Sequence, residues 1–131
     1  MNVINLMSLK SQVTYVKASV SVPMALGIMR NSGFSAIAVL EDDGSYVGIA
    51  TERDFLYSMV DGTAVDEEGH PKRVGDIADR VEAVTIDCDT MDVVTRAINE
   101  EFVPVVDGRG MFMGLVTRKK VINYLIHEQG L

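Results

Sequence analysis

Hydrophobic and polar positions follow the same order twice along the chain. Residues 35–60, SAIAVLEDDGSYVGIATERDFLYSMV, align without a gap with residues 101–126, EFVPVVDGRGMFMGLVTRKKVINYLI, so that each residue faces the residue 66 positions later. Glycine and threonine identities fix this register; they pair Gly44 with Gly110, Gly48 with Gly114 and Thr51 with Thr117. Apolar residues also face apolar residues throughout, so the pattern indicates an internal repeat.

Each copy predicts the order strand, helix, strand, strand, helix. A strand (VTYVKA or AVTID) precedes a helix with an apolar stripe, which Ser21 and Pro23 start in the first copy and Thr90 caps in the second. An apolar strand (IAVL or VPVV), an acidic turn with glycine and a second strand then follow. The last helix begins after a threonine. This order places the chain in the α+β class.

A polar segment with glycine and proline separates the two copies and is interpreted as a linker. The predicted division is 1–62 for the first repeat, 63–73 for the linker and 74–131 for the second repeat. Residues 3–7 (VINLM) and 74–78 (VGDIA) are predicted to be matching lead-in segments. A unit of about 60 residues would leave an apolar sheet face bare. The two β-α-β-β-α repeats are therefore predicted to pack sheet to sheet.

The composition excludes some classes of partner. A net charge of −7 repels nucleic acid and anionic membranes, so neither DNA nor membrane is an expected partner. Cys88 is the single cysteine, so no intramolecular disulfide can form, which fits a reducing cytoplasm. The sequence shows no apolar run of about 18 residues and no secretory signal, and a cytoplasmic location is expected.

The segment GLVTRKK, residues 114–120, places three cations at a predicted helix start. Thr117 would cap this helix, and Arg118, Lys119 and Lys120 would fill its first turn. A helix N-terminus carries partial positive charge and favours an acidic residue by roughly 0.3–1 kcal/mol. Either these cations are solvated, or they bind an anion together with free N–H groups and the Thr117 hydroxyl. The anion site is the favoured interpretation, because no acidic residue in the turn compensates the cations.

Motifs for catalysis are missing from the sequence. There is no nucleophile elbow, no metal-ligand spacing and no Walker-type phosphate loop. His70 and His127 are far apart in sequence and lack metal-like partners, so both are expected at the surface and no metal site is predicted. Enzyme activity is not expected.

The repeated pattern resembles a tandem pair of CBS domains, a Bateman module. The resemblance rests on residues 35–41 (SAIAVLE) with 48–54 (GIATERD), and on residues 102–107 (FVPVVD) with 114–117 (GLVT). It covers nearly the whole chain. It implies a pseudo-twofold body with two clefts between its sheets, which usually dimerises into a flat disk. It also implies that the module binds an adenine nucleotide and signals to an attached or separate protein.

A narrower resemblance is to the small stand-alone CBS proteins of Gram-positive bacteria that bind cyclic di-AMP. The segments QVTYV, SGFSAIAVL, NEEFVPVV and FMGLVTRKK carry it. It implies that Arg118 and Lys119, after Thr117, hold the phosphates, although Lys119 replaces a second arginine and its bidentate fork. It further implies an adenine pocket lined by Phe34, Ser35, Ala36 and Ile37. The strand that contains Val13, Thr14 and Tyr15 could pair with the adenine edge, with Tyr15 stacked on the ring, or be a plain core strand.

A second nucleotide cleft, also implied by the resemblance, would use Thr51, Asp54, Val103 and Pro104. In CBS pairs, the threonine and aspartate bind phosphate and ribose hydroxyls. As plain structure, Thr51 and Asp54 form a capping box in which Asp54 accepts the Thr51 N–H. Both interpretations stay open.

Three functions are consistent with the sequence. The leading one is a cyclic di-AMP receptor that dimerises and regulates a separate protein in trans. The second is a sensor of AMP, ADP or ATP centred on Thr51 and Asp54. The third is a dimerisation module that binds no ligand.

Overall fold

The computed structural model describes residues 2–131, which form two compact units. The central unit is Thr14–Val81, and the terminal unit combines residues 2–13 with Glu82–Leu131. The chain therefore leaves the terminal unit after residue 13, builds the central unit, and re-enters the terminal unit at residue 82. None of the helices in the described residues combines the length and the hydropathy that crossing a membrane requires.

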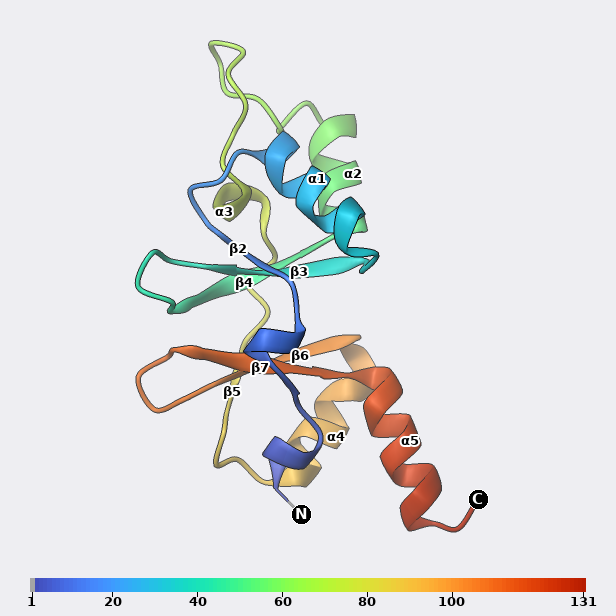
Figure 1. Ribbon diagram of the computed structural model, residues 1–131. Coiled ribbons are helices and arrows are strands. Elements are labelled where there is room, and N and C mark those ends of the chain that lie inside the picture. Colours follow the sequence, from blue (N-terminus) through green and yellow to red (C-terminus); the bar gives the residue numbers. More distant parts are fainter. Residues whose placement is uncertain (1) are drawn as a thin grey trace. The chain divides into compact units, whose positions relative to one another are not determined.

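Residues 14–81 form a three-stranded sheet with helices on one face (Figure 1). The strand order is β2 (Tyr15–Lys17), β3 (Ala36–Leu40) and β4 (Tyr46–Thr51). β2 is parallel to β3, and the crossover that a parallel pair needs contains α1 (Val22–Ser32). β3 and β4 form an antiparallel hairpin, after which come α2 (Glu52–Val60) and α3 (Val74–Ile77). The core includes Val16, Ala25, Met29, Ile37, Val39 and Phe55.

Residues 2–13 and 82–131 form a four-stranded sheet in the order β1 (Ser8–Leu9), β7 (Phe112–Thr117), β6 (Phe102–Val106) and β5 (Val84–Thr85). α4 (Thr90–Asn99) connects the parallel strands β5 and β6, and α5 (Arg118–Glu128) follows the β6–β7 hairpin. Two short 3-10 helices, η1 (Val3–Asn5) and η2 (Lys10–Gln12), flank β1. The core includes Val3, Leu6, Val93, Val103, Val116 and Val121.

The lead-in segments are exchanged between the two sequence repeats. β1 lies at the start of the first repeat, yet it pairs antiparallel with β7 of the second repeat. In the same way Asp79, which lies at the start of the second repeat, pairs with Ile49 in β4 through two backbone hydrogen bonds of 2.9 and 2.8 Å. The compact units therefore differ from the division into residues 1–62 and 74–131 by this exchange.

Gly48 and Gly114, which the repeat aligns, permit these close approaches. A β-carbon at Gly48 would lie 2.5 Å from the Asp79 carbonyl oxygen, and one at Gly114 would overlap the Ser8 carbonyl oxygen. The backbone of each lead-in thus occupies the space that any other side chain would need. Close packing against the lead-in backbone, and not a turn, therefore explains why both positions are glycine.

The predicted α+β class and element order are confirmed in each unit, while the sheet-to-sheet packing of the repeats stays a prediction. Ser21 and Thr117 cap α1 and α5 as expected, by accepting hydrogen bonds from the Met24 and Lys120 N–H groups. The prediction that Thr90 caps α4 is wrong. The cap is Asp89, whose carboxylate accepts the Met91 N–H at 3.1 Å.

Candidate functional site

The start of α5 is the candidate anion site. The Thr117 hydroxyl oxygen accepts the Lys120 N–H at 3.2 Å, and the Arg118 N–H donates to the Glu101 carbonyl oxygen at 2.9 Å. The Lys119 N–H has no hydrogen-bond partner in residues 2–131, and the side chains of Lys119 and Lys120 are exposed. One backbone donor, one hydroxyl and two exposed ammonium groups therefore gather at the positive end of this helix.

Arg118 has a partner inside the terminal unit. Its Nε donates to the Ala97 carbonyl oxygen at 2.8 Å, and its Nη2 donates to the Ile98 carbonyl oxygen at 3.4 Å. These carbonyls belong to the last turn of α4, where the helix dipole is negative and cations are stabilising. The sequence showed no acidic residue in this turn, but backbone carbonyl oxygens at the end of α4 partly compensate the charge of Arg118.

An apolar groove adjoins this guanidinium. It has a volume of about 420 Å³ and lies between α4 and α5, where it is lined by Val94, Ala97, Ile98, Arg118, Val121, Ile122 and Leu125. Ile98 is 73% exposed and Ile122 is 49% exposed. Arg118 thus separates a polar helix start from an apolar helix face.

The homologous start of α2 is acidic and internally satisfied. One carboxylate oxygen of Asp54, Oδ2, accepts both the Thr51 N–H at 2.9 Å and the Thr51 hydroxyl at 3.0 Å. The Thr51 hydroxyl oxygen accepts the Asp54 N–H in return, which confirms the predicted capping box. Asp54 also lines a cavity of about 180 Å³ with Tyr57, Ser58, Asp61, Thr63, Lys72, Asp76 and Ile77. Its role toward a ligand stays a prediction.

The predicted adenine-lining stretch divides into exposed and buried residues. Phe34, which is 54% exposed, and Ser35 line a cavity of about 280 Å³ with Met29, Arg30, Gly33 and Glu52. Ala36 and Ile37 are buried in β3. Phe34 and Ser35 can therefore offer side chains to a ligand, whereas Ala36 and Ile37 would act by shaping the strand.

The remaining predicted residues lie on strands or beside them. Val13 and Thr14 precede β2 and are half-buried, while Tyr15 lies on β2 and is 45% exposed. Val103 and Pro104 are buried in β6. The exposure of Tyr15 is compatible with base stacking, whereas the role of Val103 and Pro104 toward a ligand stays a prediction.

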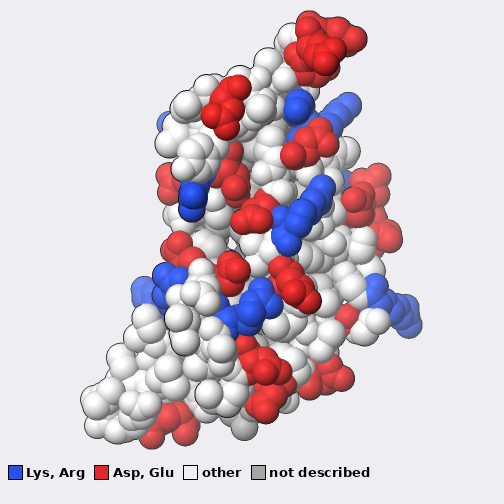
Figure 2. All heavy atoms as spheres, turned by 180° about the vertical axis from the view of Figure 1, so that it is seen from behind, with Lys and Arg blue, Asp and Glu red and all other residues white. Residues whose placement is uncertain are grey.

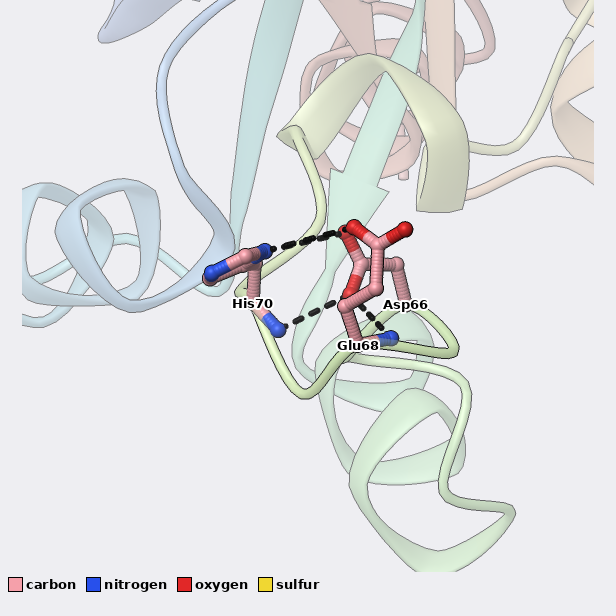
Figure 3. Close-up of side chains that lie close together, drawn as sticks. All are labelled: Asp66, Glu68 and His70. Atoms are coloured by element: carbon pink, nitrogen blue, oxygen red, sulfur yellow. Dashed lines mark hydrogen bonds and ion pairs between the residues drawn. The ribbon is translucent and has the colours of Figure 1, made fainter.

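The linker brings together a group of side chains that the sequence did not suggest. In Figure 3, Asp66, Glu68 and His70 converge on a tight turn. The Nδ1 atom of His70 lies 3.7 Å from Asp66 Oδ2 and 3.6 Å from Glu68 Oε2. His70 is at the surface as predicted, but the expectation that it has no metal-like partner is wrong. The three exposed side chains could supply ligands to a divalent cation.

On the face shown in Figure 2, lysine and arginine side chains are interspersed with aspartate and glutamate.

Burial raises the pKa of the Cys88 thiol, and the carboxylates of Asp92, Asp87 and Asp89 raise that pKa further. Cys88 packs against the core of the terminal unit, as expected for a small apolar side chain. A raised pKa makes it a poor nucleophile at neutral pH.

Known proteins share this sequence pattern over part of their length. The sequence profile of the CBS domain matches residues 4–61 and 74–127. The inosine-5'-monophosphate dehydrogenase of Nitrosopumilus maritimus (strain SCM1) is 28% identical over 108 residues, which are 82% of this chain and 21% of that enzyme. The likeness therefore covers about a fifth of the length of the dehydrogenase.

Solved structures share the fold over nearly the whole chain. The crystal structure of CbpB in complex with c-di-AMP has a TM-score of 0.82 and 19% identity, and it covers 99% of this chain and 89% of that chain. The crystal structure of CBSX2 in complex with AMP has a TM-score of 0.82 and 22% identity, with 98% of each chain covered. Because the CBS profile matches both repeats and the fold agrees, the chain belongs to the CBS-domain family and carries a tandem pair of these domains.

Proposed function

We propose that this CBS pair is a non-catalytic receptor for an adenine nucleotide, and that the ligand is cyclic di-AMP. The observation that carries the proposal is the contrast between the two homologous helix starts. Where α2 begins with Glu52 and Asp54, α5 begins with Arg118 and Lys120. The first start is satisfied by its own carboxylate, whereas the second has cations suited to an anion from outside the chain.

The chemistry of the α5 start suits a phosphodiester. Lys119 adds an exposed ammonium group and an N–H without a partner in the described residues, and Thr117 adds a hydroxyl at the same turn. Arg118 has donors in addition to those that bind α4. A cyclic dinucleotide carries two phosphates and two bases, so the cations of this turn would bind a phosphate and an aromatic ring could stack on a base. The likeness in fold to CbpB in complex with c-di-AMP supports this choice of ligand.

Isothermal titration calorimetry with cyclic di-AMP tests the proposal. Arg118→Ala and Lys119→Ala should each weaken binding by at least about tenfold, because a hydrogen bond to a charged group is worth roughly 1.5–3 kcal/mol. Arg109→Ala is the matched control, since it removes an exposed cation from the β6–β7 turn of the same unit. Binding that is undiminished in Arg118→Ala would contradict this placement of the phosphate.

A sensor of AMP, ADP or ATP is the second candidate, and Asp54 favours it. Its Oδ2 atom closes the capping box, so Oδ1 can still accept a hydrogen bond from a ribose hydroxyl. The fold also resembles CBSX2, which was solved in complex with AMP. Here Asp54→Ala should abolish AMP binding and leave cyclic di-AMP binding intact. If calorimetry detects no binding of AMP, ADP or ATP at millimolar concentration, this candidate is ruled out.

The proposed receptor acts as a cytoplasmic homodimer that regulates a separate protein in trans. Exposed apolar side chains on helices support a dimer; they include Met24, Leu56, Met59, Ile98 and Ile122. Nucleotide binding would then change the affinity for the regulated protein by reciprocal linkage.

A thermal-shift panel of nucleotides distinguishes this receptor from a module that only dimerises. A nucleotide at 100 times its dissociation constant stabilises the fold by about 2.7 kcal/mol, whereas the dimerisation module shows no shift.

A further inference from the structure

The homologous helices α1 and α4 end in different ways. α1 ends at Gly33, which has a left-handed φ of 77° and donates its N–H to the Arg30 carbonyl oxygen. This is the usual backbone closure of a helix C-terminus. α4 is followed by Glu100, which has an extended backbone with φ −117° and ψ 124° and donates its N–H to the Arg96 carbonyl oxygen at 2.9 Å. The carbonyls that follow Arg96 therefore need partners from another element.

Arg118 supplies these partners from the first position of α5. Its Nε and Nη2 donate to the Ala97 and Ile98 carbonyl oxygens, at 2.8 and 3.4 Å. Glu52 occupies the same place in the first repeat, and a carboxylate cannot donate to a carbonyl. The end of α1 is thus closed by the N–H of a glycine, and the end of α4 by the guanidinium of an arginine from another helix. We call these the glycine closure and the arginine closure, and each repeat has one of them. Only the second repeat makes the end of one helix depend on the start of another.

The guanidinium has two hydrogen-bonding edges, and α4 uses one of them. The Nε–Nη2 edge is directed at the carbonyls, and Nη1 makes no hydrogen bond within residues 2–131. A guanidinium has five N–H donors in a fixed plane, so the Nη1–Nη2 edge can form a bidentate pair with a phosphate at the same time. The carbonyls would hold the plane in place for that contact.

Resting on the proposed function, we propose that Arg118 connects the phosphate site to the end of α4. One edge of the guanidinium holds the α4 carbonyls while the other edge binds the phosphate. A bound phosphate restricts the arginine side chain, and the restricted side chain stabilises the last turn of α4. The end of α1, which its own backbone closes, does not respond.

The apolar groove between α4 and α5 lies next to this connection. Ala97 and Ile98, whose carbonyls Arg118 holds, also line the groove, and so does Arg118 itself. A change in the order of the last turn of α4 therefore changes the order of one wall of the groove. Nucleotide occupancy is in this way transmitted from a polar site to an apolar surface of the same unit.

Hydrogen–deuterium exchange with and without cyclic di-AMP tests the connection, with binding measured separately by calorimetry. Saturating nucleotide should slow exchange of the amides at residues 97–100 by about fivefold, the factor that one net hydrogen bond represents. Exchange at residues 30–33, the end of α1, should stay unchanged. In Arg118→Lys, the ammonium lacks the two fixed edges of the guanidinium, so nucleotide that still binds should no longer slow exchange at the end of α4. Arg96→Ala is the control, because Arg96 lies on α4 but donates to the Glu82 carbonyl oxygen; it should keep the wild-type response.

The possible failures are distinguishable. Nucleotide binding with unchanged or faster exchange at residues 97–100 overturns the connection and leaves the proposed function standing. A full wild-type response in Arg118→Lys also overturns it. A chain that binds no nucleotide by calorimetry overturns the proposed function and this inference together.

Discussion

The carbonyl oxygen of Ser8 occupies the space in which a β-carbon on Gly114 would have to stand. Gly114→Ala should therefore push β1 away from β7 and lower the free energy of unfolding by roughly 1–3 kcal/mol, the usual cost of overpacking. Urea denaturation measures the change. Gly108→Ala is the control, because a β-carbon there meets no atom within 4 Å and should leave the stability nearly unchanged. Equal stability of the two variants would contradict the close packing of β1 on β7.

Arg118→Ala should destabilise the protein even in the absence of nucleotide. The substitution leaves the Ala97 and Ile98 carbonyls without their donor, which costs about 1 kcal/mol. Thermal or urea unfolding of the purified chain measures this loss. Arg109→Ala, which removes an exposed cation from a hairpin turn, should unfold like the wild type. If both variants unfold alike, Arg118 does not close α4 in solution.

Asp54→Ala and Lys120→Ala alter matched positions of the repeat with different expected results. Asp54 completes the capping box of α2, and its loss should cost about 1 kcal/mol of stability. Lys120 contributes its N–H, not its side chain, to the cap of α5, so Lys120→Ala should be nearly neutral. Calorimetric unfolding of both variants gives the comparison. A neutral Asp54→Ala would show that the carboxylate has little structural role.

Cys88 should react slowly with a thiol reagent at pH 8. Burial and three neighbouring carboxylates raise its pKa, so less thiolate is present in the folded chain than in the unfolded chain at the same pH. Because the folded pKa is the higher one, this group contributes stability that is present below the unfolded pKa and is lost as the pH rises through the folded pKa. A pH–rate profile with a chromogenic disulfide, compared with the profile in urea, measures the shift. A midpoint in the folded chain at or below that of the unfolded chain would contradict it.

The sequence predicted those elements whose signals are local. The repeat aligns Thr51 with Thr117, and both cap the helices that follow, because a threonine hydroxyl can accept an N–H from the next turn whatever its wider surroundings. The capping box at Asp54 was predictable for the same reason. Cap assignment failed at α4, where Asp89 and Thr90 are adjacent and either side chain can accept the required hydrogen bond.

The features that the sequence did not reveal depend on contacts between distant segments. The pattern of residues 3–7 does not specify which of two similar strands it will accompany, so the exchange of lead-ins was not foreseen. The partner of Arg118 is a pair of backbone carbonyls. Because every residue has a backbone carbonyl, the sequence does not indicate which ones an arginine will bind. The approach of His70 to Asp66 depends on a turn geometry that residue spacing alone does not give. A missing glycine at the end of α4 was the one available signal for the arginine closure.

The exchange of lead-ins also decides how a protease would act on this chain. A single cut in the exposed linker at residues 63–73 would not release one repeat from the other. The N-terminal fragment would keep β1 of the terminal unit, and the C-terminal fragment would keep α3 of the central unit. Each fragment would therefore hold a structural part of both units. The two pieces are interleaved, and a nicked chain should stay together as a non-covalent pair until it unfolds.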